Sequence, residues 1–435
     1  MRNAKIAIYG GGGAPYHHIG VFARAGHSVS ILFPSEVRPD ILASFDAFVI
    51  PGGGYDGMRG QIDPLGKDGV EAIAQFVEAG GMYLGSCAGA YDAATPAEAF
   101  RLACPLQRAM TLSNATVWNE VADPWSDLQS PGVGRLQVLN RSPEHLIMRG
   151  IPSEFEIVHY NGPLFEGAES LFSIGNETEA FTPSEGFFSS DSAIPRMIDR
   201  AREGRVSGGV VERFGRGRAV LFGSHPEFGF SLTMDDEQLP QTMLLNAIDW
   251  QLLIGPEPVP RSATLCSETG LAATDHGTIL EAALTSIRGH VSSLQLKPLD
   301  EQWIDGRYAM SVFGQQPKAI WSQSLMRITE LADEIERLGP GIRSSTLSFR
   351  QPGDGVLDYG FHGVLALLQQ IDELLSTAEA TWHVPLGDLS ADPYKYIRSS
   401  PYHLVAGSYL AAIGRATAAA ILCRYDACDV NRSLT

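Results

Sequence analysis

The chain of 435 residues is longer than an ordinary domain of about 100–200 residues, so we expect two or three domains. Hydrophobic residues make up 44% and charged residues 19% of the sequence, which excludes a disordered or collagenous chain. The 32 basic and 50 acidic residues give a net charge of −18, so phosphate-rich and anionic lipid surfaces would repel the protein, and neither nucleic acid nor membrane is expected as a partner.

The five cysteines are too few for a disulfide scaffold and include no C-x-x-C pair. The sequence shows no secretory leader before the first apolar stretch, and no apolar run reaches the roughly 18 residues of a membrane-spanning helix. We therefore expect reduced thiols and a cytoplasmic location.

Short β-type runs alternate with helical patterns over residues 1–255. Residues 5–9, 28–33 and 47–50 read as strands, whereas residues 65–79 carry apolar side chains at helical spacing. This alternation is typical of a parallel sheet with helices on both faces. We predict an α/β domain with a flavodoxin-like, doubly wound and mostly parallel sheet.

The most specific motif is Gly-Ser-Cys-Ala-Gly-Ala-Tyr at residues 85–91, between an apolar run and a helical pattern. It has the sequence form of a tight strand-turn-helix connection that presents a nucleophile, and small neighbours keep the turn tight and the thiol accessible. A helix that begins directly after Cys87 would place unpaired N–H groups beside the sulfur and favour the thiolate. We predict that Cys87 is a nucleophile; the alternative is a buried, inert thiol.

A nucleophilic thiol needs a base, and the base needs a group that orients it. The candidates are His225 and Glu227, which follow the apolar run at residues 219–222. Because residues i and i+2 of an extended chain project to the same side, Glu227 can accept a hydrogen bond from one ring nitrogen of His225 while the other faces Cys87.

Attack on a carbonyl also requires N–H donors for the oxyanion. The N–H of Ala88 is one candidate, and the glycine-rich loop after the third strand offers the other at Gly53. The glycines at residues 10–13 lack the G-x-G-x-x-G spacing of a dinucleotide site, so no cofactor is expected. The C-terminal half has no E-x-x-H pair, so no metal is expected. His17 and His18 lie close enough to the end of the first strand to line the rim of a pocket, although we favour surface or packing roles for both.

Proline-rich residues 256–264 interrupt any helix or strand, and strand signals nearly vanish beyond them. We predict a linker there and a helical bundle domain over residues 265–435. Its four helical stretches lie near residues 275–290, 320–338, 361–375 and 402–424. Small residues on the last stretch would let another helix approach closely, either within the bundle or from a second copy or a partner protein.

Residues 1–255 resemble the class I glutamine amidotransferase-like superfamily, and more narrowly the domain at the N-terminus of some biotin-protein ligases. Three stretches carry the resemblance, and they occur in the expected order. They are Gly-Ser-Cys-Ala-Gly-Ala-Tyr at 85–91, Val-His-Tyr-Asn-Gly-Pro-Leu-Phe at 158–165, and the stretch at 217–228 that contains His-Pro-Glu. No family resemblance is evident in residues 265–435.

The resemblance implies a catalytic triad and an oxyanion hole built from the candidates above. The triad residues are Cys87, His225 and Glu227, and the oxyanion donors are the amides of Gly53 and Ala88. We also expect a substrate pocket near this site, lined by Gly54, Tyr91 and Asn161.

One position departs from the family pattern. Glutamine-hydrolysing members usually carry a glutamine four residues after the nucleophile, where this chain has Tyr91. We therefore favour a cysteine-dependent amide hydrolase or acyltransferase that forms a thioester with a small-molecule or peptide substrate. The alternatives are a glutaminase subunit that delivers ammonia and a non-catalytic, ligand-binding regulatory module.

Overall fold

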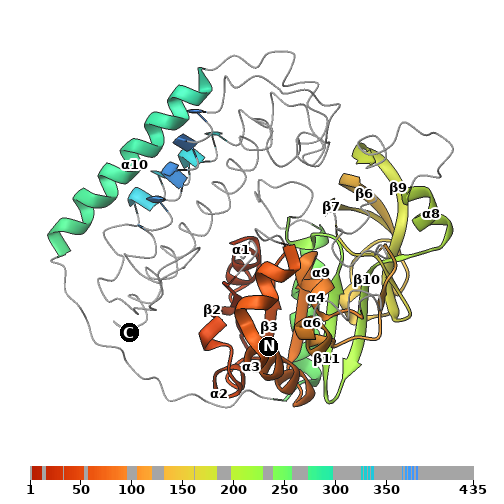
Figure 1. The fold of residues 1–435 in the computed structure, drawn as a ribbon. Coiled ribbons are helices and arrows are strands. Elements are labelled where there is room, and N and C mark those ends of the chain that lie inside the picture. Colours follow the sequence, from red (N-terminus) through yellow and green to blue (C-terminus); the bar gives the residue numbers. More distant parts are fainter. Residues whose placement is uncertain are drawn as a thin grey trace. The chain divides into compact units, whose positions relative to one another are not determined.

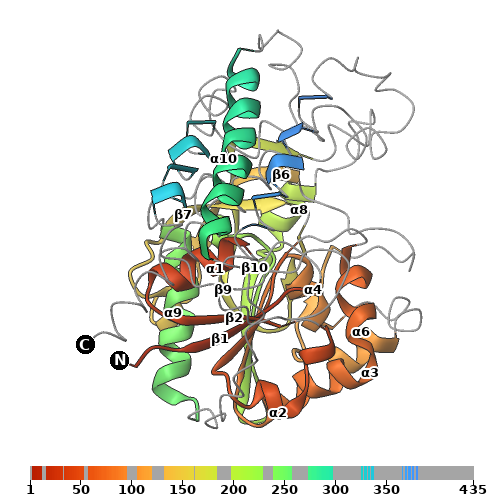
Figure 2. The ribbon, with the colours of Figure 1, turned by 90° about the vertical axis from the view of Figure 1, so that its left-hand side faces the viewer.

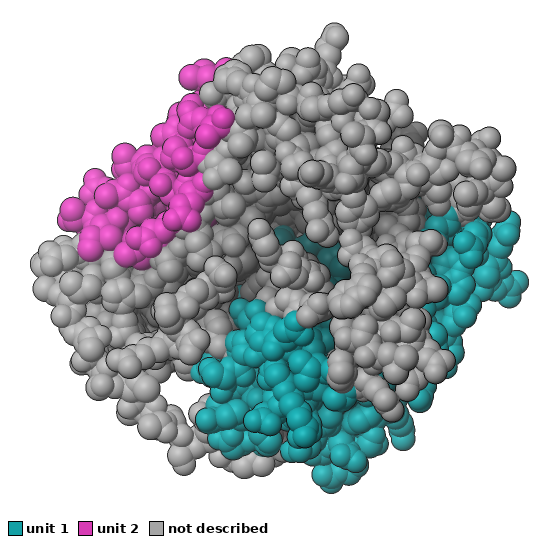
Figure 3. Space-filling view, in the orientation of Figure 1, with its two compact units in different colours: residues 1–261, 311–314 teal, residues 262–310, 315–435 magenta. Residues whose placement is uncertain are grey.

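The structure is a computed structural model. It describes residues 2–11, 16–32, 34–52, 57–95, 105–119, 132–160, 162–183, 197–228, 239–256 and 273–296, with separate helical positions within 325–337 and 365–380. The chain forms two compact units, residues 1–261 with 311–314 and residues 262–310 with 315–435 (Figure 3). Most of the predicted linker, from residue 257, lies outside the described residues.

The first unit contains all the described strands (Figure 1). The strands are β1 (Lys5–Tyr9), β2 (Ser28–Leu32), β3 (Ala47–Ile50), β4 (Met82–Ser86), β5 (Thr116–Val117), β6 (Gly132–Asn140), β7 (Glu154–Tyr160), β8 (Phe165–Glu166), β9 (Glu169–Pro183), β10 (Ser207–Phe214) and β11 (Gly217–Phe222). Its α-helices are α1 (Tyr16–Arg24), α2 (Pro39–Leu42), α3 (Gly57–Glu78), α4 (Ala88–Ala93), α6 (Pro105–Met110), α8 (Met197–Glu203) and α9 (Leu239–Ile254). Short 3-10 turns are η1 (Pro34–Glu36), η2 (Leu146–Met148) and η3 (Pro226–Phe228).

The early elements agree with the sequence pattern. The strands predicted at 5–9, 28–33 and 47–50 are β1, β2 and β3. The helix predicted at 65–79 is the second part of α3, which changes direction at Gly66, where φ is 60°. A positive φ at this position suits glycine, because other residues adopt it only with strain.

The eleven described strands form one mixed sheet. Its path runs β2-β1-β3-β4-β11-β10-β9-β6-β7, and the strands from β2 to β11 in this path are mutually parallel. The path continues with antiparallel pairs from β11 to β10, β9, β6 and β7. The prediction of a mostly parallel sheet is therefore confirmed for the core of the unit and wrong for the other half.

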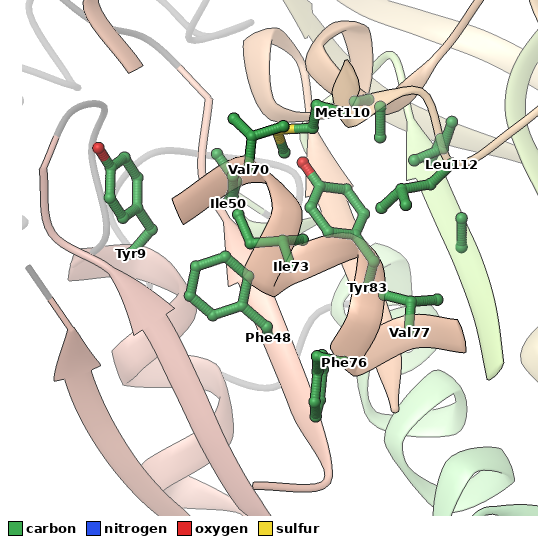
Figure 4. Packing of buried hydrophobic residues seen from close by; sticks show 14 of the residues in the cluster. Tyr9, Phe48, Ile50, Val70, Ile73, Phe76, Val77, Tyr83, Met110 and Leu112 are labelled. Atoms are coloured by element: carbon green, nitrogen blue, oxygen red, sulfur yellow. The ribbon is translucent and has the colours of Figure 1, made fainter. Parts of the chain in front are cut away.

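Both faces of the parallel strands are covered. Tyr9, Phe48 and Ile50 lie in one hydrophobic cluster with Val70 and Ile73 of α3 (Figure 4). Because successive residues of a strand point to opposite faces, their neighbours face the other side, and these are also fully buried. They are Ile6, Ile8, Ala47 and Val49. Helices α2, α3 and α6 lie on one side of the sheet, and α1 and α9 on the other (Figure 2).

The described part of the second unit is helical. The helix α10 (Ala273–Gln295) carries a stripe of buried apolar side chains: Leu280, Leu284, Ile287, Val291 and Leu294. Buried residues at helical spacing recur in the two later segments: Leu325, Ile328, Ala332, Ile335, Leu368, Ile371 and Leu375. These segments overlap three of the predicted helical stretches, while the fourth, at 402–424, lies outside the described residues. The bundle arrangement stays a prediction.

Within the described residues, no helix combines the length and the hydrophobicity needed to cross a membrane.

Candidate active site

Cys87 lies in the sharp turn between β4 and α4. Its backbone has a φ of 50° and a ψ of −112°, a conformation that residues with side chains rarely adopt. The Cys87 N–H donates to the carbonyl of Phe222 on β11 over 2.7 Å, and its carbonyl accepts from the N–H groups of Ala90 and Tyr91 at 3.0 Å each. Three hydrogen bonds thus hold the strained residue in the strand-turn-helix connection predicted from the sequence.

The glycines of the motif are required by close backbone contacts. A Cβ at Gly85 would collide with the carbonyl of Gly89, and a Cβ at Gly89 would collide with the carbonyl of Ile50 at the end of β3. The turn can therefore pack against β3 only because both positions lack side chains. This explains why small residues flank Cys87.

We expect Gly89→Ala to destabilise the first unit by about 3 kcal/mol, because the neighbouring carbonyl belongs to a buried strand and cannot move aside. Chemical unfolding measures this loss. The matched control is Gly289→Ala on α10, where an added Cβ meets no atom and the substitution should be neutral or stabilise that helix by up to about 1 kcal/mol. Equal effects of the two substitutions would contradict the packing argument.

The residues that follow β11 reach the same edge of the sheet as Cys87. Strands β4 and β11 are parallel, and Phe222 is in register with Ser86, so both chains leave the sheet side by side. The N–H of His225 then donates to the carbonyl of Val158 on β7 over 2.8 Å. This backbone bond fixes His225 next to the Cys87 turn.

The side chains of the three predicted triad residues form one hydrogen-bonded chain. The Nδ1 of His225 lies 2.7 Å from the Oε1 of Glu227, and the imidazole is also hydrogen-bonded to Cys87. Both His225 and Glu227 are buried, and the ring of Phe228 stacks on the imidazole at 4.5 Å between centroids. The arrangement has the order thiol, imidazole, carboxylate.

Electrostatics favour the charged forms of His225 and Glu227. Burial acts to lower the pKa of His225, but the charges of Glu227 and Cys87 and hydrogen bonds to both raise it to about 10. Burial acts to raise the pKa of Glu227, but the positive charges that His18 and His225 carry in the acid range where Glu227 titrates, together with its hydrogen bonds, lower it to about 2. A protonated His225 and an ionised Glu227 therefore coexist near neutral pH.

These shifts predict a pH window for stability. Glu227, with its lowered pKa, stabilises the fold above about pH 4.5, and this contribution is lost as the pH falls toward 2. His225, with its raised pKa, stabilises the fold below about pH 6.5, and this contribution is lost as the pH rises toward 10. We expect the stability difference between wild type and Glu227→Gln to be largest at about pH 4.5–6.5. Urea unfolding across the pH range measures it, and a pH-independent difference would contradict the coupling.

Gly52, at the end of β3, faces the same group of residues. A Cβ at this position would lie 2.6 Å from the Cε1 of His225 and 2.8 Å from the Cβ of Cys87. The backbone at Gly52 thus passes directly against the side chains of Cys87 and His225. The sequence identified this glycine-rich loop, and its assignment of the Gly53 amide as an oxyanion donor stays a prediction.

Other predicted site residues are placed as follows. Ala88 is the first residue of α4, where its N–H has no partner within the helix. The side chain of Tyr91, which we expected at the substrate pocket, belongs to the hydrophobic cluster and is 1% exposed. Gly53, Gly54 and Asn161 lie outside the described residues.

The second resemblance motif packs against the segment that leads into His225. A Cβ at Gly162 would collide with the carbonyl of Gly223, and a Cβ at Gly223 would collide with the carbonyl of Pro163. Asn119 holds this loop, because its side chain donates to the Gly162 carbonyl at 3.1 Å and accepts from the Leu164 N–H at 2.8 Å. The motif therefore supports the position of the base.

Sequence reasoning missed two buried histidines beside the triad. His18, on α1, has its Nε2 at 3.1 Å from the Oγ of Ser86, the residue before Cys87. His159, on β7, has its Nδ1 at 3.1 Å from the Oγ of Ser224, the residue before His225. The place of His18 shortly after the first strand allowed a position at the rim of a pocket, but the sequence favoured a surface or packing role.

Across the described segments, no group of three or more histidine, cysteine, aspartate or glutamate side chains is arranged to hold a metal ion.

Comparison of the sequence with known families gives one match, and a search of curated proteins gives no significant match. Residues 42–103 match the family model described as biotin-protein ligase, N terminal. This segment spans β3, α3, β4, Cys87 and α4.

Several solved structures are similar to this chain. A putative GMP synthase subunit from Thermoplasma acidophilum is 17% identical, with a TM-score of 0.33 and coverage of 58% of this chain and 96% of that chain. PurLQS from Thermotoga maritima is 10% identical, with a TM-score of 0.38 and coverage of 57% and 99%. A putative ThuA-like protein from Parabacteroides merdae ATCC 43184 is 12% identical, with a TM-score of 0.38 and coverage of 60% and 94%. The match over residues 42–103 confirms that the Cys87 region resembles the N-terminal domain of biotin-protein ligases.

Proposed function

We propose that the protein is a cysteine-dependent amide hydrolase or acyltransferase that works through a thioester on Cys87. The observation that carries this proposal is the hydrogen-bonded chain from Cys87 through His225 to Glu227, at the carboxyl ends of two neighbouring parallel strands. Open α/β sheets bind their ligands outside these strand ends. A strained turn at the cysteine and a carboxylate on the imidazole are the features that nucleophilic catalysis requires.

In the first half-reaction the thiolate of Cys87 attacks the substrate carbonyl carbon. A C–S bond forms, and the π electrons of the carbonyl move to its oxygen. We assign the stabilisation of this oxyanion to the N–H of Ala88 and to the neighbouring loop N–H predicted at Gly53. As the C–N bond breaks, protonated His225 donates its proton to the leaving amine, and the acyl group stays on sulfur as a thioester.

In the second half-reaction the now neutral His225 accepts a proton from water or from an amine. That nucleophile attacks the thioester, the C–S bond breaks, and the thiolate returns beside a protonated His225. Glu227 orients the imidazole and stabilises its positive charge throughout. Water as the acceptor gives a hydrolase, and an amine gives an acyltransferase.

Alkylation of the full chain with iodoacetamide at pH 7 tests the activated thiol. Peptide mapping over time gives a separate rate for each cysteine, so the other four serve as internal controls. We expect Cys87 to react at least about tenfold faster than a cysteine of ordinary reactivity. If its rate is no higher than those of Cys104 and Cys266, the proposal is wrong.

Ammonia release from glutamine distinguishes the amide hydrolase from a glutaminase. We expect little turnover, because the family's usual glutamine is replaced by Tyr91, whose side chain is buried in the core. Sustained turnover would identify the chain as the ammonia-delivering subunit instead. A Cys87→Ala protein with full biological activity would identify a ligand-binding regulatory module.

A further inference from the structure

His18 lies beside the carboxylate of the candidate triad. It is fully buried on α1, and its Nε2 is 3.1 Å from the Oγ of Ser86 and 3.8 Å from the Oε2 of Glu227. The other oxygen of Glu227, Oε1, faces the Nδ1 of His225. The carboxylate is therefore placed between two imidazoles, and its Oε2 has no hydrogen-bond partner among the described residues.

The charge state of His18 follows from this environment. Burial lowers its pKa, and the positive charge of His225 lowers it further, although Glu227 acts in the opposite direction. A neutral imidazole carries one N–H, and the position facing a carboxylate favours the N–H over a lone pair. In the tautomer with the N–H on Nε2, the ring donates to the Oγ of Ser86 at 3.1 Å, and its positive edge lies 3.8 Å from the Oε2 of Glu227.

We propose that His18 is a positioning residue that holds Glu227 in the orientation required by His225. The N–H at Nε2 stabilises negative charge on Oε2, and this leaves Oε1 directed at the Nδ1 of His225. The inference rests on the proposed function, because positioning of Glu227 matters for catalysis only if His225 acts as the base. The same N–H binds Ser86, so His18 also supports the residue that precedes the nucleophile.

His159 provides an internal comparison. It is also fully buried, its pKa is lowered to about 3 by burial and by the charge of His225, and it contacts Ser224 as His18 contacts Ser86. It has no ion pair with Glu227 among the described contacts. The titratable groups that act on His225 are thus Cys87 and Glu227 directly, with His18 and His159 as neutral neighbours.

The test compares His18→Gln, which keeps an N–H donor near the position of Nε2, with His18→Met, which removes it at similar length. NMR titration of the histidines in the full chain follows His225, whose pKa is about 10 in the wild type. We expect His18→Met to lower this pKa by about one unit, because Glu227 loses a stabilising donor, and His18→Gln to restore most of it. His159→Met should leave it within a few tenths of a unit.

A double-mutant cycle identifies the route of the effect. If His18 acts through Glu227, His18→Met should change the pKa of His225 by little in a protein that already carries Glu227→Gln. Its effect should instead add to that of Ser86→Ala, which removes the serine contact alone. Unfolding curves of each variant show that the titrations compare folded proteins.

The inference is overturned if His18→Met leaves the pKa of His225 unchanged while Glu227→Gln lowers that pKa. It is also overturned if His18→Gln and His18→Met have the same effect, because the N–H donor would then be irrelevant. Failure of the proposed function has a separate signature, an unreactive Cys87 in the wild-type chain, and the NMR readout requires no catalytic activity.

Discussion

Replacing His225 by asparagine is expected to slow acylation of Cys87 by roughly 10³–10⁴-fold at pH 7. The imidazolium hydrogen-bonded to Cys87 stabilises the thiolate, and the same group donates the proton that the leaving group requires. Asparagine supplies a hydrogen bond but neither the charge nor the transferable proton. The whole contribution of the base is therefore lost in one substitution.

An activated ester such as p-nitrophenyl acetate gives the measurement without knowledge of the natural substrate. Release of p-nitrophenol in a burst reports acylation, and mass spectrometry locates the acetyl group on the peptide that contains Cys87. A Cys87→Ala protein should show no burst. Acylation of a different residue in the wild type would contradict the assignment of the nucleophile.

The matched control for His225→Asn is His145→Asn. His145 is half-buried, and it caps η2 by accepting from the Ile147 N–H at 3.1 Å and packs on the ring of Trp250. We expect this variant to acylate within a few-fold of the wild type. A similar loss in both variants would indicate general destabilisation instead of removal of a base.

The features that the sequence predicted well are local ones. The turn at Cys87 could be predicted because Gly85 and Gly89 are required within a few residues of the thiol. The His225–Glu227 contact was predicted correctly but for the wrong reason, because Glu227 lies in the 3-10 turn η3 and not in an extended segment. The meeting of these two motifs needed one further step, the expectation that parallel strands bring their carboxyl ends to one edge, and the register of β4 and β11 confirms it.

The features that could not be predicted depend on contacts between distant parts of the chain. His18 contacts Ser86 and Glu227, which are distant from it in the sequence, and nothing within α1 distinguishes it from a histidine that only packs. The antiparallel half of the sheet likewise depends on long-range pairing, because β9 contacts both β6 and β10. The close approach of Gly52 to Cys87 and His225 also depends on contacts between distant segments, which the sequence of the glycine-rich loop does not specify.

Glu227→Gln is expected to reduce acylation of Cys87 by about 10²–10⁴-fold at pH 7 while leaving the fold intact. The glutamine carbonyl can still accept from the Nδ1 of His225, so the imidazole keeps its place. Its positive charge, however, is no longer balanced, and burial then lowers the pKa of His225 from about 10 toward or below its ordinary range. The thiolate loses its charged partner.

The pH dependence separates loss of charge from loss of shape. In Glu227→Gln the deficit should change with pH, because loss of the Glu227 charge lowers the pKa of His225 from about 10 and so moves the pH range in which the imidazolium exists. An acylation rate that is reduced by the same factor at all pH values would mean that Glu227 only orients the imidazole and that its charge has no role. The matched control is Glu212→Gln. Glu212 is also a hydrogen-bonded carboxylate, because it accepts from Ser113 and Asn114. It lies on β10 opposite Ala219, which precedes the end of β11 at Phe222. Glu212→Gln should acylate at nearly the wild-type rate, so a large loss in both variants would contradict a specific role for the Glu227 charge.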